Sequence, residues 1–356
     1  MNSDGRQTHN GISAQILNES HIDPVGPATL AGVMAEVEER VARGDTSRFR
    51  PLPTGFDPLD DVLNGGMRPG ELLIMGGAFG VGKTIFGLQV ARNVVHQNPD
   101  QAAVYICYEH DRAHLMSRLL CLESVEQRTG DAALTLRQLG NMAISPDGRG
   151  LIARLRSMPR YRPMLEVIDT YADRLTLVKA SGDRSTLDHI RMWVEEAMAH
   201  GPGRVLVVVD YLQKIPVARD ALEPEVEATT HLAQGLKELA MSLGVHVVAI
   251  AASDRPGLHS KRMRLSDLRG SSALQYEADI GLVFNNKFSI VSREHMVYNP
   301  SQADEMRSWV VVSVEKNRAG RNALDLEFGL DAAHFRLNPT GRFVRERLVD
   351  ERLVRE

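Results

Sequence analysis

The stretch ELLIMGGAFGVGKTIFGLQVARNVV, residues 71–95, decides the fold. A short apolar run leads into a glycine-rich segment, and apolar residues at helical spacing follow it. Residues 77–84 fit the pattern G-x-x-x-x-G-K-[ST], and a strand before the motif with a helix after it is the context that the motif requires. A Gly-rich turn that matches by chance is the alternative interpretation. The flanking elements favour a phosphate-binding loop.

The residue types of this loop suit a bound nucleotide. Glycines let the backbone wrap closely around a phosphate, and the N–H groups of the loop and of the helix N-terminus then point at the anion. Lys83 is expected to reach the β- and γ-phosphates, and the Thr84 hydroxyl to bind Mg²⁺. The predicted nucleotide-binding residues are Gly77, Ala78, Phe79, Gly80, Val81, Gly82, Lys83 and Thr84.

Short β-rich runs alternate with helical stretches along the rest of the chain. The predicted strands are ELLIMGG, AAVYICYE, RLTLVKA, RVLVVVD, VHVVAIAA and DIGLVFN, and the predicted helices are TIFGLQVARNVVHQ, TLDHIRMWVEEAMAH and TTHLAQGLKELAMSLG. Near-continuous apolar strands joined by helices indicate an α/β fold with a mainly parallel central sheet covered on both faces. SWVVVSVEKNRAG and ALDLEFGLDAAHFRL predict a further strand pair, and the run at residues 343–356 predicts a solvated helix.

Two strand-end carboxylates are candidates for the chemistry. Asp210 closes the apolar run VLVVVD, and open α/β sheets bind their ligands at the carboxyl ends of the strands. We expect Asp210 to hold Mg²⁺ together with Thr84, and a simple loop cap is the alternative. Glu109 closes AAVYICYE and is the candidate general base for the attacking water. A surface glutamate that opens a helix fits the spacing of Glu109 equally well.

The composition excludes several classes of protein. With 43% hydrophobic and 25% charged residues, the 356-residue chain can form one large globular domain or two modest ones. A net charge of −4 argues against a wholly basic surface and leaves room for a local basic loop. Cys107 and Cys121 lack CxxC spacing, and no further ligands complete a zinc site at His110 and His114. Without a long apolar run or a secretory signal, we expect a cytoplasmic protein that does not contact a membrane.

Residues 29–45, TLAGVMAEVEERVARGD, predict an amphipathic helix that Thr29 caps and Gly44 ends. Its apolar residues at helical spacing are Leu30, Val33, Met34, Val37 and Val41. The pattern alone fits a helix that packs on its own domain or one that docks on a neighbouring subunit.

Several segments together resemble the C-terminal motor domain of DnaB-type replicative DNA helicases. They are, in chain order, PLPTGFDPLDDVLNGGMRPGELLIMGGAFGVGKT, YICYEHDRAHLMSRLL, VVVDYLQ, MRLSDLRGSSALQYEADIGLVF and VVVSVEKNRAG. The resemblance covers residues 30–337. It implies a RecA-like ATPase domain over residues 48–337, after a mobile polar tail (1–27) and a linker-type helix (28–47) and before a charged tail (338–356).

The resemblance also implies how the site works. ATP and Mg²⁺ would be the cofactors, and the chain would form a homo-oligomer, usually a hexameric ring, with ATP at the subunit interfaces. Lys83, Thr84, Asp210 and Glu109 would act within one chain. Arg318, with Lys316, would act on the γ-phosphate of the neighbour, where an arginine can accelerate phosphoryl transfer by about 10³–10⁵. By spacing alone, KNRAGR (316–321) could be a basic hairpin turn.

The predicted nucleic-acid contact is the segment RPGLHSKRMRLSDLRGS, which lies where the family places a loop in the central channel. Its cations suit the phosphates of single-stranded DNA, and a solvated basic loop is the alternative. The candidate DNA-binding residues are Arg255, Lys261, Arg262, Arg264 and Arg269. The other candidate loop, VARDALEPEVEA (217–228), is acidic and would repel a DNA backbone.

Three features depart from the family. Only about 28 polar residues precede the linker helix, so we expect no N-terminal collar domain. Ala252 stands where the family usually has a glutamine thought to sense the γ-phosphate, and alanine cannot make that hydrogen bond. The third departure is the acidic loop at 217–228. Apart from these three features, the polar connection at residues 286–308 has no assigned role.

We therefore expect an ATP-dependent DNA helicase-like motor that moves on single-stranded DNA in replication or related DNA metabolism. A RecA- or clock-protein-like regulatory or recombination ATPase that does not unwind DNA is the alternative, and a protein that binds nucleotide without turnover is a third.

Overall fold

The computed structural model describes residues 26–127, 129–146, 148–201, 204–217, 225–253, 261–291 and 304–349. The strands in these ranges are β1 (Leu72–Gly77), β2 (Gln101–Cys107), β3 (Leu175–Lys179), β4 (Arg204–Asp210), β5 (His246–Ile250), β6 (Ile280–Asn286), β7 (Trp309–Asn317), β8 (Leu324–Asp331), β9 (Arg336–Leu337) and β10 (Arg342–Phe343). They form one sheet in the order β10-β8-β7-β6-β1-β5-β4-β2-β3, and β9 pairs with β8 outside this path.

The sheet is parallel from β6 to β3 and antiparallel from β6 to β10. Every residue of β1, β2 and β5 is buried, which explains why these strands read as continuous apolar runs. This architecture confirms the predicted α/β class with a mainly parallel sheet, and it confirms the strand pair β7–β8. The strand expected to end at Glu109 is shorter than predicted, because β2 stops at Cys107.

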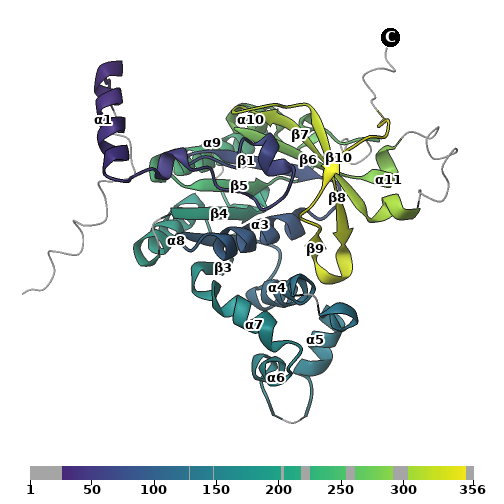
Figure 1. Ribbon diagram of the computed structural model, residues 1–356. Helices are drawn as coiled ribbons and strands as arrows, with labels where there is room; N and C mark the ends of the chain where they lie inside the picture. The colour runs from purple at the N-terminus through teal and green to yellow at the C-terminus, as the bar shows by residue number, and fades with distance from the viewer. Residues whose placement is uncertain are drawn as a thin grey trace, which may run out of the picture.

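Helices cover both faces of this sheet (Figure 1). On one face lies α3 (Lys83–Gln97), whose Phe86 stacks on Phe56 with ring centroids 4.8 Å apart. On the other face α8 (Leu187–His200), α9 (Glu225–Leu243) and α10 (Ser271–Glu277) bury their apolar residues in a second core. The two cores explain how a sheet with two apolar faces is kept from water.

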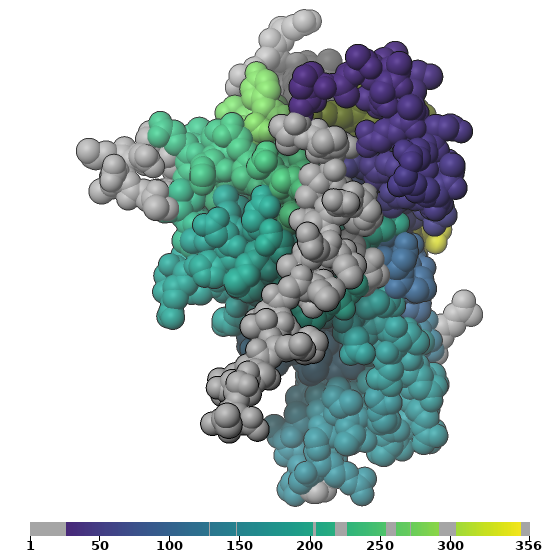
Figure 2. Space-filling model, turned by 90° about the vertical axis from the view of Figure 1, so that its left-hand side faces the viewer, coloured from purple at the N-terminus to yellow at the C-terminus, as the bar shows by residue number. Residues whose placement is uncertain are grey.

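Between β2 and β3 the chain forms a helical insert, defined here as residues 112–169. Its helices are α4 (Arg112–Glu126), α5 (Leu136–Ala143), α6 (Leu151–Ser157) and α7 (Arg162–Asp169). They share a small core of their own, which includes Leu120, Leu139, Leu155 and Met164. The insert forms the lower part of the molecule in Figures 1 and 2. The sequence analysis predicted no separate helical unit here.

The helix expected near the N-terminus is present as α1 (Leu30–Ala42), and the Thr29 side chain caps it by accepting from Gly32 N at 3.2 Å. None of its residues is buried, and its apolar side chains remain 37–75% exposed. Figure 1 shows α1 standing away from the sheet and its covering helices. In this chain the apolar face of α1 therefore does not pack on its own ATPase domain.

The helix predicted at residues 343–356 is wrong for residues 343–349, and residues 350–356 lie outside the described ranges. The chain here adds β10 to the sheet beside β8. Within this segment Glu346 accepts from Lys287 at 2.8 Å, and Arg342, just before it, pairs with Glu327 at 2.5 Å. These contacts favour an extended chain over a solvated helix.

Lys287 also corrects the expectation of a polar connection at residues 286–308. It begins the short helix α11 (Lys287–Ile290), is 2% exposed and pairs with Glu327 at 2.6 Å. Residues 292–303 of this connection lie outside the described ranges. Within the described part of the chain, no helix is both long and apolar enough to cross a membrane.

Candidate active site

The predicted phosphate loop connects β1 to α3, as the motif requires. Gly77 approaches its neighbour so closely that a Cβ there would lie 2.4 Å from the Phe284 carbonyl oxygen, at a φ of +153°. Gly82 is the N-cap of α3 with a left-handed φ of +88°. The glycines thus stand where the backbone conformation or a close neighbour leaves no room for a side chain. The loop ends at a helix N-terminus, which is suited to bind an anion.

Lys83 lies in the first turn of α3 and folds back over the loop. Its Nζ donates to the carbonyl oxygens of Gly77 at 2.8 Å and Ala78 at 2.7 Å. Burial lowers the pKa of Lys83 to about 8, although the nearby Asp210 and Glu109 carboxylates act to raise it. An ammonium in this position is poorly hydrated and gains from a phosphate partner.

Asp210 is the last residue of β4 and is 1% exposed. Its Oδ2 accepts from the Tyr105 hydroxyl at 2.9 Å. Burial raises the pKa of Asp210, while hydrogen bonds from the Tyr105 and Thr84 hydroxyls and the charge of Lys83 oppose that rise. The carboxylate and the Thr84 hydroxyl are therefore neighbours at the carboxyl edge of the sheet. Both are oxygen ligands of the kind that Mg²⁺ prefers.

Glu109 lies in the bend between β2 and α4, two residues beyond the strand. The N-cap of α4 is Asp111, whose side chain accepts from His114 N at 2.8 Å. Glu109 therefore does not itself cap this helix. Its side chain is exposed and lines the same cavity as Lys83 and Asp210.

One cavity of about 440 Å³ joins these groups. The loop residues Gly77, Phe79, Gly80, Gly82, Lys83 and Thr84 line it together with Glu109 and Asp210. It opens at the carboxyl ends of β1, β2, β4 and β5, where ligands bind in open α/β sheets. The glycine cradle, the lysine and the paired oxygen donors fit a magnesium-bound nucleoside triphosphate.

Lys316 and Arg318 lie at the opposite edge of the sheet. Asn317, between them, pairs with Ile280 at the start of β6, and Ile280 in turn pairs with Leu73 near the start of β1. Since β1 has six residues, this edge lies a strand length of about 20 Å from the phosphate loop.

The Asp279 carboxylate and nearby backbone carbonyl groups bind the two cations at this edge. Arg318 Nη1 lies 3.3 Å from Asp279 Oδ1, and Arg318 Nη2 donates to the Tyr276 carbonyl at 2.7 Å. Lys316 Nζ donates to the carbonyl oxygens of Gln275 and Tyr276. Neither cation lines the nucleotide cavity of its own chain.

The candidate DNA-binding residues differ in how exposed they are and in what they contact. Arg255 lies outside the described ranges. Arg262 is only 8% exposed and is bonded to Asp325 and Ser313. Arg264 is half-buried and pairs with Glu315 at 3.1 Å. Lys261 and Arg269 remain exposed.

Arg269 lines the nucleotide cavity, and so does Ala252. Gln213, of the DYLQ motif, joins these two segments. Its Oε1 accepts from Ala252 N at 2.9 Å, and its Nε2 donates to the Arg269 carbonyl at 3.1 Å. Ala252, two residues beyond β5, is thus tied through Gln213 to the carboxyl-terminal end of the basic segment. Residues 218–224 of the acidic loop lie outside the described ranges.

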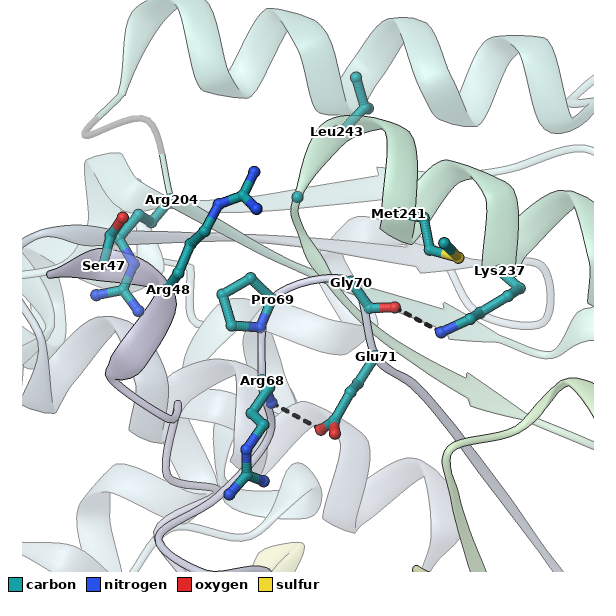
Figure 3. Close-up of a pocket in the computed structure, with 11 residues that line it drawn as sticks. Ser47, Arg48, Arg68, Pro69, Gly70, Glu71, Arg204, Lys237, Met241 and Leu243 are labelled. Carbon is teal, nitrogen blue, oxygen red and sulfur yellow. Dashed lines mark hydrogen bonds between the residues drawn. The ribbon is translucent and has the colours of Figure 1, made fainter. Parts of the chain in front are cut away.

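A second cavity, of about 460 Å³, lies at the amino-terminal edge of the sheet and is lined by several cations (Figure 3). Figure 3 shows the guanidinium groups of Arg48, Arg68 and Arg204 pointing in different directions. Lys237 is already bound to the Gly70 carbonyl at 2.8 Å and to Asp279 at 2.7 Å. The cations do not converge on one point, and this cavity has none of the residues that the nucleotide site brings together.

Several residues that line the nucleotide cavity were not predicted, and His110, Arg118 and Phe335 are among them. His110 and His114 do not form a zinc site with other ligands in the described chain; their rings stack 4.7 Å apart. Arg118 lies on α4, nine residues after Glu109, and it reaches the cavity because of the direction in which α4 leaves the sheet. The local sequence therefore gave no signal for Arg118, and Phe335 comes from the distant turn before β9.

The chain is similar to known proteins in sequence. The DnaB-like helicase C terminal domain matches residues 51–336. The replicative DNA helicase DnaB of Geobacillus stearothermophilus is 26% identical over 231 residues, which are 64% of this chain and 46% of that protein. DnaB of Mycoplasma pneumoniae is 27% identical over 325 residues, 87% of this chain and 62% of that protein. The chain thus spans about half the length of such relatives.

Solved structures show the same fold. An ATPase domain of known structure superimposes with a TM-score of 0.67 at 19% identity, covering 88% of this chain and 99% of that domain. A DnaB-like replicative helicase, described with its interactions with primase, gives a TM-score of 0.63 at 20% identity over 88% of this chain and 67% of that one.

Proposed function

Because the chain belongs to the DnaB-like helicase C-terminal domain family, we propose that it is an ATP-dependent motor that moves on single-stranded DNA. The observation that carries this proposal is the cavity at the carboxyl edge of the sheet. It brings the phosphate loop, Lys83, Asp210 and Glu109 together from three separate strands. This set has a donor for the phosphates, ligands for a metal and a base for water.

Each residue then has one task in ATP hydrolysis. The N–H groups of residues 77–84 and the Lys83 ammonium bind the phosphates. Thr84 and Asp210 would hold Mg²⁺, which when bound would neutralise charge on the phosphates. Glu109, exposed in the cavity and free of a capping role, orients the attacking water and accepts its proton. The buried position of Lys83, whose pKa is lowered to about 8, favours a bound polyanion.

Arg318 is proposed to complete the site of a neighbouring copy. It lies at the opposite edge of the sheet from its own phosphate loop, so it cannot serve that loop within one chain. Asp279 and Tyr276 hold its guanidinium, which is still half-exposed and accessible to a partner. Lys316, anchored beside it, adds a second positive charge.

The exposed face of α1 supports the same assembly. Its apolar side chains contact no buried core of this chain, and a second copy is the occupant that a ring provides. A homo-oligomeric ring, hexameric as usual in this family, would cover these side chains and bring Arg318 to a neighbouring nucleotide. Exposed Lys261 and Arg269, with Arg255, are the proposed contacts to DNA phosphates.

A non-unwinding ATPase of the RecA or clock-protein type is the second candidate, and Ala252 favours it. Ala252 lines the nucleotide cavity but has no side-chain amide to sense a phosphate. Gln213 is bonded to its backbone, so a link from the cavity to the basic segment is retained. ATP-driven displacement of a labelled strand from a fork distinguishes the two candidates, since only a helicase releases the strand.

The proposal is tested by ATP hydrolysis with and without single-stranded DNA. The wild-type chain should hydrolyse ATP only with Mg²⁺, and single-stranded DNA should stimulate it. Lys83→Ala should reduce turnover by about 10²-fold or more because it removes a phosphate contact of the transition state. Lys261→Ala is the matched control and should leave DNA-free hydrolysis unchanged. Wild-type turnover in Lys83→Ala would refute the site assignment.

A further inference from the structure

Arg118 lies in the wall of the nucleotide cavity, and none of the roles above uses it. It projects from α4, and its Nη2 donates to His110 Nε2 at 3.1 Å. The face of its guanidinium lies over the Phe335 ring, 5.0 Å from the centroid. Its Nε is buried and has no hydrogen-bond partner among the described residues. A neutral imidazole and an aromatic ring thus hold a cation beside the phosphate loop.

The charge of Arg118 is not balanced by a paired carboxylate within the described residues. No carboxylate of the described residues lies within 4.0 Å of it, whereas the buried Arg92 has a two-point contact with Glu123. Burial lowers the pKa of Arg118, and the more distant Tyr105, Asp210, Cys107 and Glu109 act in the opposite direction. A partly buried guanidinium without a paired anion is costly. An anion in the cavity would relieve that cost.

The neighbours of Arg118 indicate which part of the nucleotide it would meet. Its bonding partner His110 directly follows Glu109 in the chain, and Arg118 lines the same cavity as Glu109 and Asp210, to which we assign the attacking water and the metal. Both of these act at the terminal phosphate in phosphoryl transfer. The guanidinium therefore lies at the γ-phosphate end of the cavity and not at the base or ribose end.

We propose that Arg118 contacts the γ-phosphate of ATP bound to its own chain, and that His110 and Phe335 hold the guanidinium in position. This inference rests on the proposed function. With this contact, two arginines would act at the γ-phosphate: Arg118 from the same chain and Arg318 from a neighbour. An ATP molecule would then replace solvent at Arg118, while ADP, which has no γ-phosphate, would leave it unpaired.

The contact predicts a preference for ATP over ADP that depends on Arg118. A charge-assisted hydrogen bond to one phosphate corresponds to about 10–100-fold in affinity. Arg118→Met keeps the length and the apolar contact with Phe335 but removes the charge. It should weaken ATP binding by about 10–100-fold and change ADP binding by less than about twofold.

The experiment uses the full chain with Glu109→Gln, which should bind ATP without turning it over. Dissociation constants for fluorescent ATP and ADP are measured with Mg²⁺ by anisotropy. They are compared for this parent, for the parent with Arg118→Met, and for the parent with Arg156→Met. Arg156 is an exposed arginine of the same insert, paired with Asp169, and its loss should change neither affinity.

Three results have distinct meanings. Selective loss of ATP affinity in Arg118→Met supports the contact. An unchanged ATP affinity, or an equal loss for ATP and ADP, overturns it and leaves Arg118 with a structural role at most. If the parent itself binds neither nucleotide, the assignment of an ATP site fails, and the Arg118 contact fails with it.

A second pair of variants tests the positioning residue and does not depend on Arg118→Met being folded. His110→Gln retains an acceptor for the Arg118 guanidinium and should retain most of the ATP preference. His110→Phe keeps a ring against His114 but removes the acceptor, so the ATP preference should fall while ADP binding stays unchanged. Equal nucleotide preferences in the two variants would show that His110 does not position Arg118.

Discussion

His246 is a buried histidine that the nucleotide site does not use. It begins β5, is 1% exposed, and neither ring nitrogen has a hydrogen-bond partner among the described residues. Burial and, to a smaller extent, the charge of nearby Arg204 lower its pKa from 6.5 to about 3, while the Val205 backbone opposes the shift. The imidazole therefore stays neutral in the folded chain across the physiological range.

This burial predicts acid sensitivity. The unfolded chain binds the proton more tightly than the folded chain, so the contribution of His246 to stability is full above pH 6.5 and is lost as pH falls toward 3. Between about pH 6.5 and about pH 5 the free energy of unfolding should fall by about 2 kcal/mol from this residue. Urea unfolding at these two pH values should show a smaller fall for His246→Leu than for wild type. The exposed His231→Leu is the control, and an equal fall in all three chains would contradict the prediction.

The predictable residues were those whose role follows from local sequence. Lys83, Thr84 and Asp210 lie in motifs that fix their position relative to a strand end, and the structure brings them into one cavity. The ion pair of Arg262 was not predictable because its partner, Asp325, is 63 residues away, and no local pattern marks a buried ion pair. Arg118 was overlooked because its proximity to Glu109 depends on how α4 leaves the sheet.

At the scale of elements, a buried ionic contact joins α3 to the helical insert. Arg92 on α3 makes two hydrogen bonds to Glu123 on α4, at 2.5 and 2.7 Å. The Tyr171 hydroxyl, from beyond α7, donates to the same carboxylate at 2.6 Å. Arg92 and Glu123 are almost fully buried, with side chains 6% and 0% exposed. The helix that follows the phosphate loop is therefore fixed to the insert that contains Arg118.

Breaking this contact should destabilise the protein strongly. Glu123→Gln leaves the Arg92 charge buried without a counter-ion, which should cost about 3–5 kcal/mol in the free energy of unfolding. Asp169→Asn breaks the exposed pair with Arg156 in the same insert and should cost less than about 1 kcal/mol. Urea denaturation of the two variants measures both values. A loss of similar size in both would show that burial does not set the strength of this contact.

The elements themselves were predictable in proportion to their length and regularity. The parallel strands are continuous apolar runs because helices cover both of their faces. In the insert, α5, α6 and α7 have only seven or eight residues each, too few for a clear helical period. The pattern at 343–349 has helical spacing, but Lys287 binds Glu346 and Glu327 binds the preceding Arg342, and these contacts hold the chain extended.

At the scale of the whole molecule, the phosphate loop and Arg318 lie at opposite edges of one sheet. If Arg318 acts on a neighbour, Arg318→Ala and Glu109→Gln chains should each be nearly inactive, since the arginine contributes about 10³–10⁵ to the rate. Mixed in equal amounts, they should regain about a quarter of the wild-type sites in randomly assembled rings. ATPase activity of the mixture is the measurement, with each variant alone as control. No gain over the separate variants would count against a shared site.

Because the phosphate loop and Arg318 lie at opposite edges of the sheet, each subunit has two different ends. Copies that meet head to tail can continue as an open line or close on themselves. An open line always leaves one phosphate loop without a donor at one end and one unused arginine at the other. Closure into a ring removes both ends at once. The rate of ATP turnover per chain would therefore report how many open assemblies have closed into rings.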